Sequence, residues 1–170
     1  MVWARTRLLI WDYVFEPVKE IRISFTGKNP EKFYKKLHEL FRLVFNVPEG
    51  YIQEKDYKWE KTRGVERFDV SWEITRIFDI FSYLAIEVDM RGFSTEGEGR
   101  INIAIKPRLI TEYPQDTIWQ QSIFYEMMRR MWHRAFYHSK RMHYLDYSKE
   151  MVMNFEHQLK DFAEELKAAS

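Results

Sequence analysis

The chain has 170 residues, of which 45% are hydrophobic and 17% aromatic, and its formal net charge is +1. This length is enough for one well-buried core and short for two, so we expect a single domain spanning residues 1–170. Because the sequence contains no cysteine, it excludes disulfides, thiolate zinc sites, iron–sulfur clusters and cysteine nucleophiles.

The N-terminal segment, residues 1–20, carries positive charges followed by a short apolar run. The run from Leu8 to Trp11 ends at Asp12, so it is too short for the apolar region of a secretory signal. The sequence also lacks the ~18 consecutive apolar residues of a membrane span. We therefore expect a cytoplasmic protein with no membrane partner. Abundant Glu, Lys and Arg with few asparagines also resemble the composition of thermophile proteins.

The sheet region, residues 21–116, is expected to begin with a strand and a helix. Apolar and polar residues alternate over Ile21–Phe25, which predicts a half-buried strand. A helix over residues 30–46 follows, because Asn29 is a favourable cap and Pro30 is favourable at the first helical position. The apolar residues of this helix recur at helical spacing and are Phe33, Leu37, Leu40, Phe41, Val44 and Phe45.

Further strands are predicted between residues 51 and 113, where apolar residues recur at every second position. No helical pattern interrupts them, so we expect an antiparallel meander with one apolar, covered face and one polar face. Turn residues at 62–64 and 96–99 separate the strands, and Pro107 and Pro114 are expected to close the sheet. The strand segments are Tyr51–Trp59, Phe68–Ile74, Leu84–Met90 and Ile101–Ile105.

The C-terminal region, residues 117–167, carries a helical pattern throughout. One straight helix of this length would run roughly 75 Å at ~1.5 Å per residue. That exceeds the size of such a domain, so we expect a break near Tyr144–Ser148. The sequence thus predicts an α+β fold: an antiparallel β-meander with one face covered by an N-terminal amphipathic helix and long C-terminal helices.

Charge is organised in one segment of this helical region. Residues 129–144 hold five Lys or Arg, three of the five histidines and no acidic residue. On a helix the basic residues form a strip flanked by tyrosines, and the apolar residues face the core. Cations interleaved with aromatic rings suit contacts with phosphates or nucleic-acid bases. The candidate anion-binding residues are Arg130, Arg134, Tyr137, Lys140 and Arg141.

The alternative interpretation of this strip, which we favour because the chain as a whole is not basic, is a solvated helix face that pairs with the acidic C-terminal stretch. The acidic residues of that stretch are Asp146, Glu150, Glu156, Asp161, Glu164 and Glu165. The three histidines of the segment, His133, His138 and His143, lie five residues apart. Five helical steps rotate the chain by about 140°, so one helix directs the three rings to different sides. Zinc sites need ligands on a shared face. We therefore expect no metal site, and the sequence contains no cofactor motif.

Two carboxylates of the predicted sheet are candidates for acid–base chemistry. If the strands around Trp72 and Val88 pair so that Trp72 faces Met90, then Glu73 lies opposite Asp89. Carboxylates directly opposite one another repel, and crowding raises the pKa of one of them. The alternative, which we favour, is an exposed patch that neighbouring Lys and Arg neutralise.

The order of strand, amphipathic helix, antiparallel meander and long C-terminal helix resembles the helix-grip fold of the START and Bet v 1-like superfamily. The resemblance covers Ile21 to Leu166 and rests on element order. The chain differs from the family in having one helix after the first strand instead of two. It implies a curved sheet around the C-terminal helix, with an apolar cavity between them. The cavity or core candidates are then Trp72, Ile74, Ile86, Val88, Ile103, Met131 and Trp132.

Three functional hypotheses follow. The first is a non-catalytic binding or interaction domain, which holds an apolar small molecule or the partner subunit of a homo-oligomer between sheet and helices. The second is anion or nucleic-acid binding through the basic helix face of residues 129–144. The third is an enzyme of unrecognised type that uses the sheet carboxylates. We favour them in this order.

Overall fold

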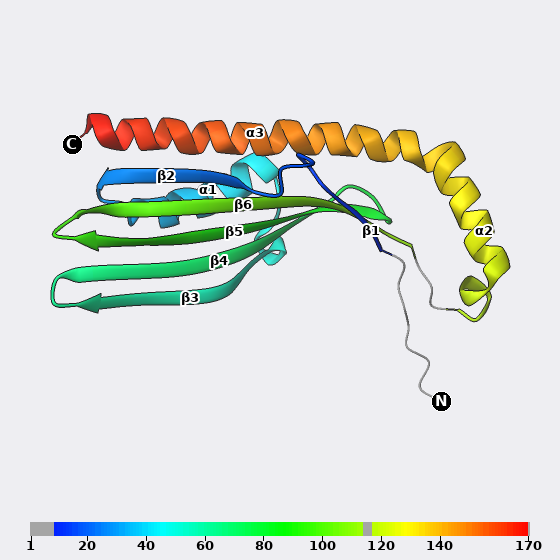
Figure 1. The fold of residues 1–170 in the computed structure, drawn as a ribbon, viewed down its shortest axis with the longest axis horizontal. Helices are drawn as coiled ribbons and strands as arrows, with labels where there is room; N and C mark the ends of the chain where they lie inside the picture. The colour runs from blue at the N-terminus through cyan, green and yellow to red at the C-terminus, as the bar shows by residue number, and fades with distance from the viewer. Residues whose placement is uncertain (1–8, 114–116, 170) are drawn as a thin grey trace.

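The computed structural model describes residues 9–113 and 117–169 of the chain. It has the α+β fold that the sequence predicts: a six-stranded antiparallel sheet with an N-terminal helix and a long C-terminal helix packed on it (Figure 1). The strands are β1 (Leu9–Tyr13), β2 (Ile21–Lys28), β3 (Ile52–Thr62), β4 (Val65–Ile77), β5 (Ser82–Thr95) and β6 (Glu98–Glu112). The helical elements are α1 (Lys32–Phe45), the short 3-10 turns η1 (Glu49–Tyr51) and η2 (Trp119–Gln121), α2 (Ile123–Trp132), the π-helical turn η3 (His133–Tyr137) and α3 (His138–Ala168).

The sheet is the expected meander with an additional edge. Strands β3 to β6 pair antiparallel in chain order, and β1 and β2 both pair with the other side of β6. Two-residue turns join β3 to β4 at Arg63 and Gly64 and join β5 to β6 at Glu96 and Gly97. All four residues have positive φ, as type I′ hairpin turns require. Both turns lie where the sequence predicts them.

Pro107 does not close the sheet, contrary to the expectation. It lies inside β6, opposite Ile86 of β5. Its carbonyl accepts a hydrogen bond from the N–H of Val14 at 3.2 Å. Because the N and C=O of a strand residue point to the same side, the missing N–H of Pro107 faces the junction between β1 and β2. Hydrogen bonding to β6 is already interrupted there, so the strand tolerates the proline. The second expected stop, Pro114, lies outside the described residues.

Helix α1 begins later than the sequence predicts. Asn29 has φ 55°, whereas an N-cap residue adopts an extended conformation. Its N–H donates to the carbonyl of Gly97 at 2.7 Å, so Asn29 turns the chain out of β2 and does not cap the helix. The cap position belongs to Glu31, which makes no side-chain capping bond.

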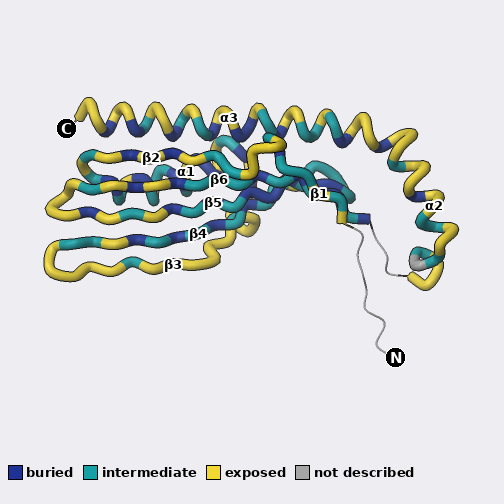
Figure 2. The backbone as a smooth tube through the Cα atoms, in the orientation of Figure 1, coloured by how far each residue is buried: buried dark blue, intermediate teal, exposed yellow. Residues whose placement is uncertain are grey.

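The core lies between the sheet and helices α1 and α3, which cover the same face. The ring of Phe41 in α1 lies 5.6 Å from both Trp72 of β4 and Phe155 of α3. Figure 2 shows the buried positions along the inner side of α3 and at alternate positions of the central strands. Five of the cavity or core candidates lie in this core and are no more than 1% exposed: Trp72, Ile74, Ile86, Val88 and Ile103.

The expected break near Tyr144–Ser148 is wrong, because α3 continues through this segment without interruption. The hydroxyl of Ser148 donates to the carbonyl of Tyr144 at 2.7 Å, a bond that a helix accommodates. The helical region changes direction earlier, at η3 (Figure 1). A π-helical turn is a recognised cause of a kink.

Helix α2 projects beyond the end of the sheet and contacts mainly η2 and η3 (Figure 1). Its Met131 is 62% exposed and its Trp132 is 40% exposed. Neither residue lies in the hydrophobic core, so the expectation of a core position is wrong for Met131. Trp132 stacks on the buried Tyr137 with ring centroids 5.3 Å apart and lines a pocket, as a cavity-lining candidate should. The kink at η3 directs α2 away from the sheet, so an apolar helix face finds no sheet to cover. Within the part of the chain that the structure describes, no helix combines the length and apolar character needed to cross a membrane.

Candidate functional site: an aromatic pocket under α2

A pocket of about 380 Å³ lies where α2 approaches the end of the sheet. Its size is within the range of small-molecule sites. Two residues form the wall of the pocket nearest the sheet: Phe81, from the loop between β4 and β5, and Tyr113, directly after β6. The remaining lining residues belong to η2 and α2 and are Trp119, Phe124, Tyr125, Met128, Arg129 and Trp132.

Aromatic rings form the wall of this pocket. The ring centroid of Phe81 lies 5.3 Å from that of Tyr113 and 5.7 Å from that of Trp132. On the η2 side, the rings of Trp119 and Phe124 lie 5.7 Å apart. These distances are typical of stable aromatic clusters. The wall therefore offers flat apolar surfaces to a bound molecule.

Arg129 is the one charged residue among the described residues that line the pocket. It is only 9% exposed, and its guanidinium lies 5.5 Å from the ring centroid of Tyr113. Its Nη2 lies 3.6 Å from Oε1 of Glu126, while its Nη1 is buried with no hydrogen-bond partner among the described residues. An unsatisfied buried donor is costly, so an acceptor that reaches this nitrogen from the adjacent pocket would gain a hydrogen bond.

Tyr113, which lines the pocket, and its hydrogen-bond partner His133 are neutral near pH 7. The hydroxyl of Tyr113 lies 2.6 Å from Nδ1 of His133. Burial lowers the pKa of His133, and the nearby Arg141, His138 and Arg129 lower it further. Burial also raises the pKa of Tyr113 to about 12, although Arg129 and Arg141 oppose this change. The positive charge of the pocket therefore belongs to Arg129.

A polar network centred on Asp79 holds the pocket wall in place. The carboxylate accepts the backbone N–H of Phe81 at 2.9 Å and that of Ser82 at 2.8 Å. It also accepts the hydroxyl of Tyr137 at 3.0 Å and lies 2.9 Å from Nζ of Lys140. Asp79 therefore fixes the loop that carries Phe81 to the start of α3.

This network controls the ionisation of Asp79. Burial acts to raise the pKa of the carboxyl, but hydrogen bonds from Lys140, from the N–H groups of Phe81 and Ser82 and from Tyr137 outweigh it and lower the pKa to about 2. Burial and the neighbouring Asp79 raise the pKa of Tyr137, although its hydrogen bond with Ser82 opposes the change. The sequence prediction missed Asp79. The available signal was an Asp in a short loop before a strand, where its side chain caps the following N–H groups.

The candidate anion-binding residues do not form one exposed strip. Tyr137 and Arg141 are each 3% exposed. Arg141 donates from Nη1 to Asp12 at 2.6 Å and from Nε to Thr111 at 3.0 Å. Both side chains therefore connect the helical region to the sheet. Helical spacing indicates which residues share one face of a helix. Which face packs on the sheet depends on the kink at η3, which the spacing does not reveal.

The three remaining candidates, Arg130, Lys140 and Arg134, lie at the surface. Arg130 donates to Glu126 at 2.8 Å, and Lys140 pairs with Asp79. Arg134 is exposed within η3. Among the described residues, the acidic partners of this basic segment are thus Glu126 of α2, Asp79 of the β4–β5 loop and Asp12 of β1, and not residues of the C-terminal part of α3.

The predicted pairing of Glu73 with Asp89 is wrong. Glu73 lies opposite Glu87, and Asp89 lies opposite Ser71. The actual register differs from the expected one by two residues. Alternation determines which face a side chain occupies, but it does not distinguish two registers that keep the same face.

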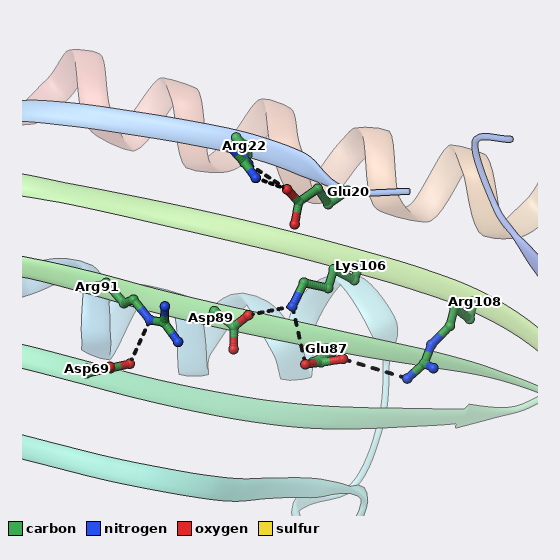
Figure 3. A network of polar contacts seen from close by, with 8 residues as sticks. All are labelled: Glu20, Arg22, Asp69, Glu87, Asp89, Arg91, Lys106 and Arg108. Carbon is green, nitrogen blue, oxygen red and sulfur yellow. Dashed lines mark hydrogen bonds and ion pairs between the residues drawn. The ribbon is translucent and has the colours of Figure 1, made fainter. Parts of the chain in front are cut away.

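Lysines neutralise the carboxylates on this open face of the sheet. Nζ of Lys106 lies 2.8 Å from Asp89 and 3.4 Å from Glu87, between the two carboxylates (Figure 3). Nζ of Lys55 lies 2.7 Å from Glu73. The residues proposed for acid–base chemistry are thus parts of separate ion pairs along the strands.

Two of the three histidines lie side by side, contrary to the expectation that the three rings point to different sides. The ring centroids of His133 and His138 are 6.3 Å apart, because the π-helical turn η3 alters the rotation between residues five positions apart. His143 is exposed on α3. Among the described residues, no three His, Cys, Asp or Glu side chains are grouped so that they could hold a metal ion.

No family model and no curated protein matches this chain. Among solved structures, one of a Staphylococcus aureus protein of unknown function is similar to it. The match covers 91% of this chain and 98% of that chain, with 13% sequence identity and a TM-score of 0.24. A likeness at this level carries no argument about function.

Proposed function

We propose that this chain is a non-catalytic binding domain that holds an apolar small molecule in the aromatic pocket under α2. The observation that carries the proposal is the pocket itself, a concave space of about 380 Å³ lined by six aromatic side chains, one methionine and one arginine. An apolar concavity with few polar groups is the usual form of a small-molecule site. The aromatic surfaces supply apolar contact area, and the single arginine supplies specificity.

The proposed site is displaced from the one that the helix-grip resemblance implies. In that arrangement a ligand lies between the sheet and the C-terminal helix. In this chain Phe155 and Leu159 of α3 are fully buried and belong to the hydrophobic core between that helix and the sheet. The α+β layout with a long C-terminal helix supports the resemblance, whereas the pocket supports binding at the end of the sheet.

Titration with a neutral apolar dye such as Nile red tests the proposal. We expect saturable binding, and we expect the Trp132→Ala substitution to weaken it roughly three- to tenfold, because an aromatic wall contact is lost. Trp11→Ala is the matched control, since Trp11 is 49% exposed on β1 and does not line the pocket. No saturable binding to the unaltered protein, or equal losses in the two variants, would contradict the proposal.

A second candidate function is self-association through α2, and one observation favours it. Ile123 is 90% exposed and Met131 is 62% exposed, and neither lines the pocket. Exposed apolar patches mark interaction surfaces. The occupant that fits is a second copy of this chain. In an antiparallel pair of α2 helices, Glu126 near one end would approach the basic Arg130 and Arg134 of the other copy, as a two-fold interface requires.

A further inference from the structure

We propose that the ligand of the pocket under α2 is an amphipathic monoanion, a carboxylate on an apolar body, and that Arg129 binds the carboxylate. This inference rests on the proposed binding function of the pocket. It adds the chemical class of the ligand and the residue that selects it.

The guanidinium of Arg129 is buried and, within the described part of the chain, lacks a full set of hydrogen-bond acceptors. The side chain of Arg129 is 8% exposed, so it is more than nine-tenths buried, and it lines the pocket. Its Nη1 has no hydrogen-bond partner among the described residues. Buried arginine nitrogens are ordinarily satisfied by an acceptor, and a charge-assisted bond to a carboxylate oxygen is among the strongest available.

The charges around Arg129 sum to a net positive charge. Glu126 is the acidic group next to Arg129, but it is shared with a second arginine. Its Oε1 accepts a hydrogen bond from Arg130 at 2.8 Å and lies 3.6 Å from Nη2 of Arg129. One carboxylate between two guanidinium groups leaves a net positive charge, and the closer partner is Arg130. Arg129 therefore keeps most of its charge for a ligand.

The same geometry favours a single negative charge over two. Nη1 of Arg129 lacks a hydrogen-bond partner among the described residues, whereas Nη2 already faces Glu126. The carboxylate of Glu126 repels a second negative charge placed beside it. Tyr113 and His133, which are bonded to each other at 2.6 Å, provide no further cation. A carboxylate fits this site better than a phosphate dianion.

The rest of the pocket determines the body of the ligand. Phe81, Trp132 and Met128 surround the space next to Arg129. These side chains offer no second charge, so the remainder of the ligand is apolar. A medium-chain fatty acid has this chemistry, and decanoate with 1-decanol forms a matched pair that differs only in the headgroup.

Calorimetric titration of decanoate and 1-decanol into the unaltered protein tests the headgroup directly. We expect decanoate to bind about tenfold or more tightly than 1-decanol, because a charge-assisted hydrogen bond to a buried donor is gained. Equal affinities, or a preference for the alcohol, would overturn the inference and leave the pocket proposal intact. Binding of neither compound would instead contradict the proposed function.

Variants identify the arginine. In Arg129→Gln we expect the preference for decanoate to disappear while the affinity for 1-decanol is retained, and in Arg129→Lys we expect part of the preference to remain. Arg134→Gln is the matched control, because Arg134 is an exposed arginine of the neighbouring turn η3 and does not line the pocket. Equal losses in Arg129→Gln and Arg134→Gln would overturn the assignment. If Arg129→Gln does not unfold cooperatively, the comparison of Arg129→Lys with Arg134→Lys decides, and an unchanged preference in both overturns it.

Discussion

At the scale of single residues, one carboxylate connects three parts of the fold. Asp79 accepts two backbone N–H groups of its own loop and bonds with Tyr137 of η3 and Lys140 of α3. The same loop carries Phe81 into the pocket wall. The position of that wall, and hence the shape of the pocket, depends on the Asp79 contacts.

Replacing this carboxylate is expected to destabilise the protein. In Asp79→Ala we expect the free energy of unfolding to fall by about 2–3 kcal/mol, because buried donors lose their acceptor. Urea titration followed by circular dichroism measures the change. Asp69→Ala is the matched control, since the side chain of Asp69 is 43% exposed and pairs with Arg91 at the surface. Its expected cost is within about 0.5 kcal/mol. Similar costs for both variants would contradict the assigned role.

The lowered pKa of Asp79 predicts a specific pH dependence. The pKa is about 2 in the folded protein and about 3.9 in an unfolded chain. The folded state therefore binds this proton less readily, so the stabilisation is complete above pH ~4 and is lost as the pH falls from ~4 towards ~2. The unfolding free energy of the wild type, minus that of Asp79→Asn, should be constant near neutral pH and decrease in that window. A constant difference down to pH ~2 would refute the shift.

Residue patterns give only part of this site. An Asp in a short loop before a strand is a recognisable signal for side-chain capping of loop N–H groups, so Asp79 was within reach of sequence analysis. The burial of Tyr137 and Arg141 was not. Their helical angles are readable, but the side that meets the sheet follows from where the helix kinks, and neither Gly nor Pro marks η3.

At the scale of elements, the hairpins with two-residue turns were predictable and the longer connection was not. Arg63 with Gly64 and Glu96 with Gly97 fix the register of their hairpins, because both residues of a type I′ turn need positive φ. Between β4 and β5 the loop of residues 78–81 has no such turn. The alternation there determines the faces but leaves a two-residue ambiguity, which is why the predicted Glu73–Asp89 pair was wrong.

The hairpin of β5 and β6 depends on a glycine beyond its turn. A Cβ atom at Gly99 would lie 1.9 Å from the carbonyl oxygen of Phe93 and 2.7 Å from the Cα of Ser94. Backbone atoms cannot move aside as a flexible side chain can. We therefore expect Gly99→Ala to lower the free energy of unfolding by about 2–3 kcal/mol.

Thermal and urea unfolding of Gly99→Ala measure this cost. Gly50→Ala is the matched control, because a Cβ there has no heavy atom within 4 Å and its change is expected within about 0.5 kcal/mol. A neutral effect of Gly99→Ala would show that the hairpin relaxes more easily than this close approach indicates.

At the scale of the whole molecule, the two ends differ in how their apolar residues are covered. At one end α1 and α3 close over the sheet, and Phe41, Trp72 and Phe155 form one contact chain. At the other end α2 lies beyond the sheet with many exposed positions (Figure 2), and these include the apolar Ile123 and Met131. Hydrophobic periodicity predicted an apolar face on both helical segments. It could not tell which face is covered within the chain and which is left for a ligand or a second copy.

This asymmetry gives the test of self-association. Because α2 adds little to the core, Ile123→Glu should leave the free energy of unfolding of the isolated chain nearly unchanged while it disrupts a contact between copies. Light scattering should then show a dimer for the unaltered protein and a monomer for the variant. Met153→Glu is the matched control, since Met153 is 58% exposed on α3, and this variant should remain dimeric. A strictly monomeric unaltered protein at high concentration would exclude a second copy as the partner of α2. The binding assays alone would then test the function of this end of the molecule.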